Sequence, residues 1–491
     1  MLLSCLLQGY YFYQIQTDCD ISQLALDSRQ IIPHALFVAL HGTHENGSKY
    51  IPDAISKGAA AILIEAETEN AAITQQHNVP IIPIYQLKNK LGQIASRFYE
   101  EPAKKLRMIG VTGTNGKTSC THFIAQILQS LHQPCGLIGT LGSGFYGSLS
   151  EMGLTTPDAI TLQATLQHLL KQDAKAIAME VSSHSLDQGR VNDIPFEIGI
   201  FTNLTQDHLD YHGDMAAYAK VKQRFFAEWP IKHLILNADD SYGAAWIHQL
   251  AQQKSVFAYS IRKPAFSDIP AIYTKRLLLG STEIKALVAS PFGECNITVP
   301  LIGQFNLSNA LAVLTALCLY GIPFKEACYA LSQLEPVPGR MQILGGGKKP
   351  LVVVDYAHTP DALEKVLQAL RDHTNGKLIC VFGCGGDRDQ TKRPEMAKIA
   401  EELADQVIVT NDNPRHEKQE EIAKQIMQGF THPERVSILL DRSKAIKDSI
   451  QLASPGDCVL IAGKGAERYQ QIGNEKIPFD DVEWVKQFLD L

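Results

Sequence analysis

Long hydrophobic runs are missing from this sequence, and so are runs of basic residues. No apolar stretch approaches the roughly 20 residues that a membrane-spanning helix needs. The apolar residues 1–7 lack the basic flank and the small-residue cleavage site of an export signal. The net charge of −7 over 491 residues gives no indication of a nucleic-acid-binding surface. We therefore expect a protein that has neither a membrane nor a nucleic acid as a partner.

Paired cysteines are missing as well. The ten cysteines are scattered singly, most of them lie inside apolar runs, and the C-x-x-C spacing of zinc and redox sites does not occur. This distribution is typical of buried, reduced thiols in a cytoplasmic protein. Cys120, which directly follows a glycine-rich loop, is either a reactive or a merely packed thiol. The remaining composition, 45% hydrophobic and 20% charged, is that of an ordinary globular protein.

The length of the chain is enough for three domains of about 150 residues each. Two segments interrupt the alternation of apolar and polar runs. They are the charged, proline-bearing residues 100–105 and the prolines within residues 336–339. We therefore expect domains at residues 1–101, 102–335 and 336–491.

Short apolar runs of strand length indicate the fold class. They lie at 35–40, 61–64 and 81–84 in the first domain, at 108–111, 176–179, 198–201 and 234–236 in the second, and at 351–354, 378–382, 407–409, 436–440 and 459–462 in the third. Helical segments lie between them, and continuous apolar strands indicate parallel sheets covered on both faces. We expect an α/β protein with a small N-terminal α/β domain, a central P-loop ATPase-like parallel sheet and a C-terminal Rossmann-like α/β domain.

A glycine-rich loop follows the apolar run at 108–111. The loop leads into a helical pattern that places Phe123, Ile124, Ile127, Leu128 and Leu131 on one face. Strand, glycine loop and helix in this order are the setting of a phosphate-binding loop, in which backbone N–H groups and the helix N-terminus hold oxyanions. Lys117 would reach the β- and γ-phosphates, and Thr118 would ligate Mg²⁺. The spacing departs from G-x-x-x-x-G-K-[ST] because the first glycine is Gly110, one residue early.

Polar residues at strand ends are the next candidates, because ligands bind beyond the carboxyl ends of parallel strands. Glu180 closes one apolar run, and its carboxylate suits Mg²⁺. His208, in the loop 207–213, is on chemistry alone either a metal ligand or a loop histidine that only makes hydrogen bonds. The segments 26–29 and 42–47 are either binding loops or ordinary polar turns.

Four segments, in this order, resemble the Mur ligases, the ATP-dependent amide-forming enzymes that build the cell-wall peptide. They are 112–118 (TGTNGKT), 180–184 (EVSSH), 207–213 (DHLDYHG) and 355–361 (DYAHTPD). The match runs across nearly the whole chain. It explains the glycine spacing, because TGTNGKT is the form that the loop takes in this family. Within the family, residues 412–415 (DNPR) resemble the motif of the members that add meso-diaminopimelate.

The resemblance implies an ATP-dependent acid–amino-acid ligase of peptidoglycan biosynthesis. Its reaction would add meso-2,6-diaminopimelate to UDP-N-acetylmuramoyl-L-alanyl-D-glutamate through an acyl-phosphate intermediate, with ATP as co-substrate and Mg²⁺ as cofactor. The expected partners are these small molecules alone, and we expect a cytoplasmic monomer.

Three alternatives compete with this function. The ligase of the same pathway that adds L-lysine is disfavoured because lysine has no distal carboxylate to pair with Arg415. A folylpolyglutamate synthetase is disfavoured by the N-terminal domain with its Asp27-Ser28-Arg29 segment. The third alternative belongs to a different class, a non-catalytic nucleotide-binding module or a simple P-loop phosphatase. The non-catalytic module is disfavoured because Lys117, Glu180 and Lys222 are all present, and phosphate release without an amino acid would favour the phosphatase.

The resemblance also implies roles for single residues. The catalytic residues are Lys117, Glu180, His208 and Lys222, and the metal ligands are Thr118, Glu180, His208 and a carbamylated Lys222, with Lys220 as the competing lysine. The ATP-binding residues are Gly113, Thr114, Asn115, Gly116, Lys117, Thr118, Ser119, Asn306, Asn309, Arg340 and Asp355.

The other substrates have their own implied residues. The UDP-muramoyl-dipeptide would be bound by Ser28, Thr155, Thr156, Ser182, Gln188 and Arg190, with loop 42–47 at the uridine end. Diaminopimelate would be bound by Arg388, Asp412, Asn413, Pro414, Arg415, Gly463 and Glu467. Two positions depart from the family pattern: Asn46 stands where aspartate is common, and Ala466 stands where histidine is frequent.

Overall fold

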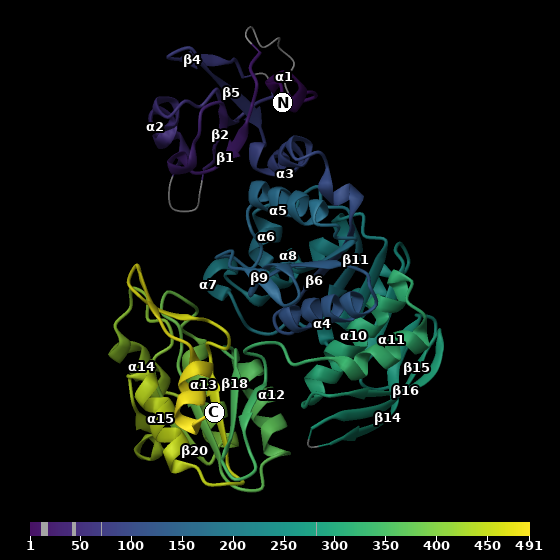
Figure 1. The fold of residues 1–491 in the computed structure, drawn as a ribbon, viewed down its shortest axis with the longest axis vertical. Coiled ribbons are helices and arrows are strands. Elements are labelled where there is room, and N and C mark those ends of the chain that lie inside the picture. Colours follow the sequence, from purple (N-terminus) through teal and green to yellow (C-terminus); the bar gives the residue numbers. More distant parts are fainter. Residues whose placement is uncertain (11–17, 42–45, 70, 281) are drawn as a thin grey trace. The chain divides into compact units, whose positions relative to one another are not determined.

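The structure, a computed structural model, describes residues 1–10, 18–41, 46–69, 71–280 and 282–491. By compactness the chain divides into two units. The first contains residues 1–110, 133–197 and 228–231, and the second contains residues 111–132, 198–227 and 232–491. Parallel strands joined by helices form the main sheets, so the expected α/β class is confirmed (Figure 1). The expected boundaries after residues 101 and 335 stay predictions.

The first unit begins with a five-stranded sheet in the order β1-β2-β3-β5-β4, parallel except for β4. Alternate strand residues enter two cores, one under α1 and α3 and the other under α2. This alternation is the expected pattern for a sheet covered on both faces. The elements are α1 (Leu3–Leu6), β1 (Gln23–Ala25), η1 (Ser28–Gln30), β2 (Ala35–Ala39), η2 (Gly47–Tyr50), α2 (Ile51–Ser56), β3 (Ala61–Ala66), β4 (Thr74–Gln76), β5 (Val79–Tyr85), α3 (Leu87–Phe98) and η3 (Pro102–Lys105).

The rest of the first unit is built on β7 and β10, which pair in parallel, and on the antiparallel strands β8 and β9. Helix α5 packs against α3. Its N-cap Asp158 accepts hydrogen bonds from the backbone N–H groups of Ile160 and Thr161. The elements are β7 (Cys135–Gly139), β8 (Gly142–Phe145), β9 (Ser148–Ser150), α5 (Ala159–Lys171), β10 (Ala176–Glu180) and α6 (Ser183–Asp187).

Two strands, β6 (Arg107–Thr112) and β11 (Phe196–Phe201), begin in the first unit and end in the second. In the second unit β11, β12, β13 and β14 pair in parallel, and β15 and β16 extend them in antiparallel fashion. The other elements here are α4 (Lys117–Ser130), α7 (Leu209–His212), α8 (Met215–Glu228), β12 (His233–Asn237), α9 (Ser241–Leu250), β13 (Val256–Ser260), β14 (Ala271–Leu279), β15 (Ile284–Ser290), β16 (Gly293–Val299), α10 (Gln304–Tyr320), α11 (Phe324–Ala330) and η4 (Leu331–Gln333).

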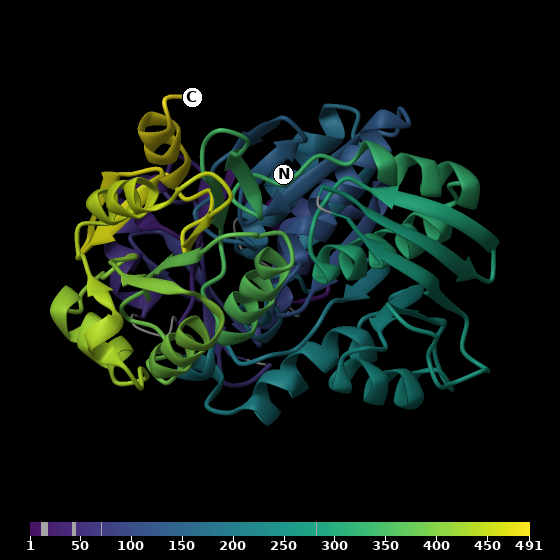
Figure 2. The ribbon, with the colours of Figure 1, turned by 90° about the horizontal axis from the view of Figure 1, so that it is seen from below.

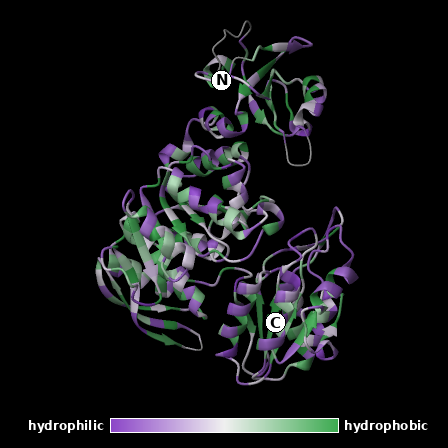
Figure 3. Cartoon of the chain, turned by 180° about the vertical axis from the view of Figure 1, so that it is seen from behind, coloured by the Kyte–Doolittle hydropathy of each residue, from purple (hydrophilic) through white to green (hydrophobic). Residues whose placement is uncertain are grey.

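The C-terminal sheet of the second unit has the order β17-β18-β22-β19-β20-β21, with β17 antiparallel to β18 and the other pairs parallel. Alternate residues of its strands enter two cores, one with α12, α13 and α14 and the other with α15 and α16. Figure 2 shows helices on both faces of this sheet, and Figure 3 shows its apolar strands between more polar helices.

The elements of this part complete the chain. They are β17 (Gln342–Gly345), β18 (Leu351–Asp355), α12 (Pro360–Arg371), β19 (Leu378–Phe382), α13 (Lys392–Leu403), β20 (Gln406–Val409), α14 (Gln419–Met427), η5 (Pro433–Arg435), β21 (Ser437–Ile438), α15 (Arg442–Leu452), β22 (Cys458–Ala462), the hairpin β23 (Tyr469–Ile472) and β24 (Glu475–Pro478), and α16 (Asp481–Leu489). All ten cysteines are free thiols. None of the helices in the described ranges has the length and apolar character of a membrane span.

Candidate active site

The phosphate loop of the second unit has the strand–loop–helix geometry that the sequence predicts. Gly116, the N-cap of α4, adopts the left-handed conformation with φ 87°. A side chain at Gly113 would place its Cβ 1.9 Å from Thr202 Oγ1, so this close approach also requires glycine. The Lys117 ammonium donates to the carbonyl oxygens of Gly113 and Thr114, at 2.9 and 2.8 Å. Lys117 is therefore held against the loop that would bind phosphate.

A cavity of about 460 Å³ lies next to this loop. Apolar side chains, among them Phe305, Met341 and Tyr356, form part of its lining. Cavities of roughly 300–1,000 Å³ with a mixed apolar and polar lining are typical small-molecule sites. Eight of the residues expected to bind ATP line it together: Asn115, Gly116, Thr118, Ser119, Asn306, Asn309, Arg340 and Asp355. The other three, Gly113, Thr114 and Lys117, belong to the same loop.

Two polar contacts join the phosphate loop to the C-terminal part of the same unit. Arg340 donates from Nη2 to Thr118 Oγ1 at 3.0 Å, and its guanidinium lies 4.2 Å from the ring centre of Tyr356. Asn115 donates from Nδ2 to Asp361 Oδ2 at 3.0 Å. Residues more than 200 positions apart in the chain thus meet at one place. Cys120, which follows the loop, is fully buried, so it is a packed thiol.

Lys222, the lysine expected to carry a carbamate, is a buried residue of α8. Its side chain is 1% exposed, and its Nζ donates to the carbonyl oxygen of Gly113 at 2.9 Å and to Thr112 Oγ1 at 3.3 Å. Burial, and then the charge of Lys117, hold the pKa of the Lys222 amine well below its ordinary value. The competing Lys220 is exposed. An unprotonated amine is the form that reacts with CO₂, so Lys222 fits this modification.

The expected metal ligands belong to both units. In the first unit Glu180, which is 1% exposed, accepts at Oε1 from the backbone N–H of Thr140 at 2.8 Å. In the second unit His208 is the N-cap of α7 in the left-handed conformation, with φ 57°. No three His, Cys, Asp or Glu side chains of the described residues form a group able to hold a metal ion. The carboxylate of Glu180 in the first unit and the hydroxyl of Thr118 in the second are each hard oxygen donors of the kind that suits Mg²⁺, and a carbamate on Lys222 would be another.

Asp207 is a buried acid whose role the sequence pattern did not indicate. Its carboxylate lies 3.4 Å from His208 Nε2, 3.7 Å from His358 Nε2 and 3.7 Å from Lys392 Nζ. Burial by itself would raise the pKa of Asp207. The hydrogen bond with His358 and the charges of His208 and Lys392 instead hold that pKa well below its usual value. Asp207 is therefore an ionised group that joins the 207–213 loop to the C-terminal part of the unit. The sequence feature that could have indicated this residue is its position as the first residue of the segment DHLDYHG.

Five of the residues expected to bind the muramoyl-dipeptide form one cluster in the first unit. Thr156 Oγ1 donates to the backbone oxygen of Glu180 at 2.9 Å and lies 3.2 Å from Ser182 Oγ. Arg190 donates from Nη1 to the backbone oxygen of Thr156 at 2.7 Å and from Nε to Gln188 Oε1 at 2.9 Å. The cluster also includes Thr155, whose hydroxyl lies 3.1 Å from that of Thr140.

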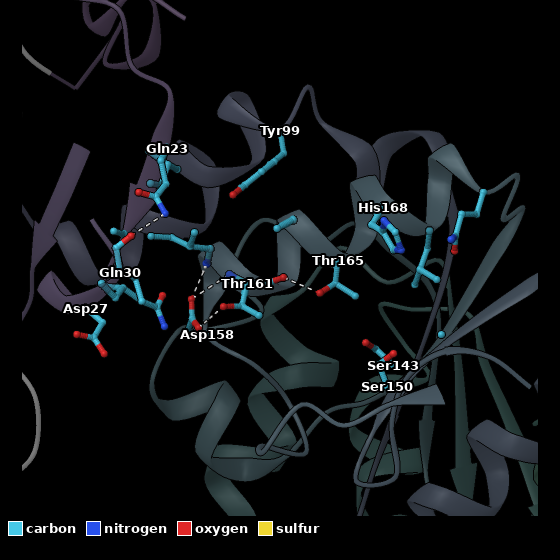
Figure 4. Close-up of a pocket in the computed structure, with 18 of the residues that line it drawn as sticks. Gln23, Asp27, Gln30, Tyr99, Ser143, Ser150, Asp158, Thr161, Thr165 and His168 are labelled. Carbon is cyan, nitrogen blue, oxygen red and sulfur yellow. Dashed lines mark hydrogen bonds between the residues drawn. The ribbon is translucent and has the colours of Figure 1, made fainter. Parts of the chain in front are cut away.

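Ser28, the sixth of these residues, is buried at the start of η1. Its neighbours Asp27 and Gln30 line a cavity of about 990 Å³ in the first unit. Figure 4 shows Thr161, Thr165 and His168 of α5 on another side of this cavity. Of the loop 42–47, residues 42–45 lie outside the described residues. Of the two others, Asn46 is the N-cap of η2 and accepts from the backbone N–H of Ser48, and Gly47 is the first residue of η2.

The residues expected to bind the amino acid gather beyond the carboxyl ends of β19, β20 and β22. Arg415 adopts the left-handed conformation (φ 50°) and donates from Nη1 to the backbone oxygen of Gly386 at 2.7 Å. A Cβ on Gly463 would lie 2.5 Å from Asp412 Oδ2. The structure brings together the loops that hold Arg388, Asp412, Asn413, Pro414, Arg415, Gly463 and Glu467.

Lys464, whose role the sequence pattern did not indicate, is fully buried among these loops. Its Nζ donates to Asn413 Oδ1 at 3.0 Å and to Glu467 Oε2 at 2.9 Å. Asn413 also donates from Nδ2 to Glu467 Oε2 at 2.8 Å. The buried ammonium of Lys464 thus joins Asn413 and Glu467, two of the residues expected to bind the amino acid. Its position inside the GKGAE segment was the available signal.

Three family models match the chain in order. The model described as "Mur ligase family, catalytic domain" matches residues 20–99, "Mur ligase middle domain" matches residues 111–317, and "Mur ligase, glutamate ligase domain" matches residues 339–465.

Individual relatives are similar over nearly the full length. A protein of Coxiella burnetii named UDP-N-acetylmuramoyl-L-alanyl-D-glutamate--2,6-diaminopimelate ligase is 48% identical over 475 residues, which are 97% of each chain. A protein of Pseudomonas aeruginosa with the same name is 48% identical over 480 residues, again 97% of each chain. A solved structure of an enzyme with this name is 36% identical, has a TM-score of 0.67 and covers 96% of this chain and 95% of its own.

Proposed function

The chain belongs to the Mur ligase family, and we propose that it joins meso-2,6-diaminopimelate to UDP-N-acetylmuramoyl-L-alanyl-D-glutamate with conversion of ATP to ADP and phosphate. Relatives that bear the name of this reaction and are 48% identical support the assignment. The 412–415 segment, which resembles the motif of the diaminopimelate-adding members, supports the choice of amino acid. A cytoplasmic location and a monomeric state are further parts of the proposal.

The observation that carries the proposal is the cavity beside the phosphate loop. Its lining combines loop residues such as Thr118 with Asn306 and Asn309 of α10 and with Arg340 and Asp355. This combination provides backbone and cationic groups for a triphosphate and apolar surface for a base. The site therefore supports ATP as the source of the transferred phosphoryl group.

In the first step the γ-carboxylate of the D-glutamyl residue attacks the γ-phosphorus of ATP, ADP leaves, and an acyl phosphate forms. An anion must approach a triphosphate, so positive charge has to be fixed at the loop before the reaction. The Lys117 ammonium, held by two loop carbonyls, supplies that charge. Two bound Mg²⁺ ions would act as Lewis acids on phosphate oxygens, with Thr118 as a ligand of one ion and Glu180, His208 and a carbamylated Lys222 as ligands of the other.

In the second step the amine of the incoming amino acid attacks the acyl carbon, a tetrahedral intermediate forms, and phosphate leaves. Arg415 and Arg388 would pair with carboxylates of diaminopimelate, because a guanidinium binds a carboxylate through two parallel hydrogen bonds. Asp412, Asn413 and Glu467 would bind the distal ammonium and carboxylate. Orienting the amine in this way supplies a large part of the rate enhancement of a two-substrate step.

Amino-acid-dependent phosphate release tests the proposed function. The purified chain is incubated with ATP, Mg²⁺ and the UDP-muramoyl-dipeptide, and meso-diaminopimelate, L-lysine or L-glutamate is added in turn. We expect phosphate release only with diaminopimelate, together with a UDP-muramoyl-tripeptide product in the mass spectrum.

The other outcomes each support a different function. Release with L-lysine alone would assign the lysine-adding reaction. Release with L-glutamate and a folate substrate in place of the dipeptide would assign a folylpolyglutamate synthetase. Release without any amino acid would indicate a phosphatase, and no release under any condition would indicate a non-catalytic nucleotide-binding protein.

A further inference from the structure

A buried ion pair lies beside the amino-acid-binding loops and has no part in the proposed reaction. Arg442 begins α15 and Asp481 begins α16, and neither side chain has any exposed surface. Nε and Nη2 of Arg442 donate to the two carboxylate oxygens of Asp481, both at 2.7 Å. Two parallel hydrogen bonds of this kind fix both the position and the plane of the guanidinium.

The same guanidinium makes two more hydrogen bonds, and both reach the start of a ligand loop. Nη1 donates to the backbone oxygen of Asn411 at 3.1 Å, and Nη2 donates to the backbone oxygen of Ala462 at 3.0 Å. Asn411 directly precedes the segment 412–415, and Ala462 directly precedes the segment 463–467. In the sheet, β19 lies between β20 and β22. One side chain therefore joins the ends of two strands that do not pair with each other.

The positive charge of Arg442 interacts electrostatically with carboxylates of the amino-acid-binding loops. Burial alone would lower the pKa of this guanidinium. The charge of Asp481, followed by those of Asp412 and Glu467, raises the pKa above its ordinary value. The two loops are also packed closely against each other, since a Cβ on Gly463 would lie 2.5 Å from Asp412 Oδ2. A displacement of one loop would therefore be transmitted to the other.

We propose that Arg442 and Asp481 are positioning residues that set the separation of the loops 412–415 and 463–467 and thereby the selection among incoming amino acids. The inference rests on the proposed function, because that function places the amino acid at these loops. The Arg442 side chain has no exposed surface with which to contact an amino acid. It acts through the carbonyl groups of Asn411 and Ala462, and an error of about 1 Å in the position of a binding group is enough to weaken binding strongly.

The test uses Arg442→Lys and Asp481→Asn in the full-length chain. A lysine keeps the positive charge, but a single ammonium cannot bind both oxygens of Asp481 and reach both carbonyls. We expect the KM for the amino acid to rise about tenfold or more, in line with the cost of misplacing a binding group. We expect the KM for ATP to change less than twofold, and the preference for the best amino acid over the next best to fall.

Two control variants separate positioning from a general loss of stability. Val485→Ala removes buried volume from α16, the helix that also carries Asp481, without touching the loops. Arg371→Lys alters a cation that donates to the backbone oxygen of Leu403 and to Asp405, which precede β20 at its other end. We expect both controls to lower the melting temperature or leave it unchanged, with the KM for the amino acid unaltered.

The possible results are distinct. The inference is wrong if Arg442→Lys and Asp481→Asn leave the KM for the amino acid unchanged. It is also wrong if Val485→Ala, with an equal loss of melting temperature, raises the KM for the amino acid by the same factor.

Absence of amino-acid-dependent turnover in the wild type would instead overturn the proposed function. Calorimetric titration of diaminopimelate into the ADP-loaded wild type and variants would then replace KM. If the wild type prefers another amino acid, the same comparison is made with that one. Should Arg442→Lys fail to fold, the KM for the amino acid is compared between the wild type and Asp481→Asn alone, because asparagine preserves the side-chain volume of aspartate.

Discussion

At the scale of single residues, Arg415 shows how the structure holds a predicted ligand in place. A left-handed backbone is uncommon for a residue other than glycine and is concentrated at functional sites. Here the conformation is fixed from both sides, because the Arg415 N–H donates to the backbone oxygen of Gln471 and its carbonyl accepts from Gly473. The β23–β24 hairpin therefore acts as the support of the arginine that would bind the amino acid.

Replacing Arg415 should separate amino-acid binding from nucleotide binding. We expect Arg415→Ala to lower kcat/KM for diaminopimelate about 100-fold or more, because losing one partner of a buried charge pair costs about 2–5 kcal/mol. The affinity for ADP, measured by calorimetry, should stay within about twofold of the wild type, since the cavity beside the phosphate loop is elsewhere. Arg435→Ala, an exposed arginine of the same domain, is the matched control. Unchanged diaminopimelate kinetics in Arg415→Ala would remove this residue from the site.

At the scale of elements, α4 is buried on all sides instead of on one face. The sequence pattern predicts an apolar face that includes Phe123 and Ile124. In the structure every residue from 118 to 128 is buried, including the polar His122 and Gln126. Gln126 is accommodated because it exchanges two hydrogen bonds with the backbone of Glu335. The helix that follows the phosphate loop is thus packed on all sides over residues 118–128.

The buried His122 should make the protein sensitive to acid. Burial, and then the charge of Arg340, lower its pKa from 6.5 to about 4. Between these values the unfolded chain binds a proton that the folded chain does not, so stability is full above pH 6.5 and falls as the pH is lowered towards 4. Acidification from pH 7 to pH 5 should therefore cost about 2 kcal/mol through this group.

Urea unfolding of His122→Gln at the two pH values checks this expectation. The difference in unfolding free energy between pH 7 and pH 5 should be about 2 kcal/mol smaller than in the wild type. His132→Asn, an exposed position just after α4 with a left-handed backbone that asparagine tolerates, should behave like the wild type. Equal pH dependence in wild type and His122→Gln would show that His122 does not titrate in this way.

The elements also show what could be predicted from the sequence. The phosphate loop and β19, β20 and β22 follow from local patterns, because a glycine loop and short apolar runs determine them with little help from distant residues. The expected strand at 436–440 is reduced to β21 (Ser437–Ile438), an exposed edge strand with one neighbour. The roles of Asp207, Lys464 and Arg442 were not predicted. Each is defined by partners far along the chain, and a charged residue in a sequence does not reveal whether it will be buried and paired.

At the scale of the whole molecule, the second unit joins the phosphate loop to segments from the far end of the chain. Asn115 donates to Asp361 of α12, and Gln206 donates to Thr391 Oγ1 at 2.9 Å. Together with the pairing of Asp207 and Lys392, these contacts tie the nucleotide-binding loops to the part of the chain that would bind the amino acid. We therefore expect binding of ATP and positioning of the incoming amino acid to be coupled through these contacts within one unit.

Breaking one of these contacts should weaken ATP use without abolishing it. We expect Asp361→Ala to lower kcat/KM for ATP roughly fivefold, because its hydrogen bond with Asn115 contributes about 1 kcal/mol and its ion pair with the exposed Lys365 contributes little. Steady-state kinetics at saturating dipeptide and amino acid measure it. Glu364→Ala, on the exposed face of the same helix, is the control and should match the wild type. If the two variants behave alike, the Asn115–Asp361 contact has no part in turnover.

The position of β22 has a consequence for how the protein is made. This strand, near the end of the chain, pairs with both β18 and β19 and so fills the centre of the C-terminal sheet. Until residues 458–462 have left the ribosome, β18 and β19 lack the strand that pairs with both, and the backbone N–H and C=O groups along those two edges stay unpaired. The C-terminal sheet, and the loops that would bind the amino acid, must therefore form after β22 has been synthesised. Nascent chains that stop before β22 should be substrates for chaperones and proteases rather than partly active enzymes.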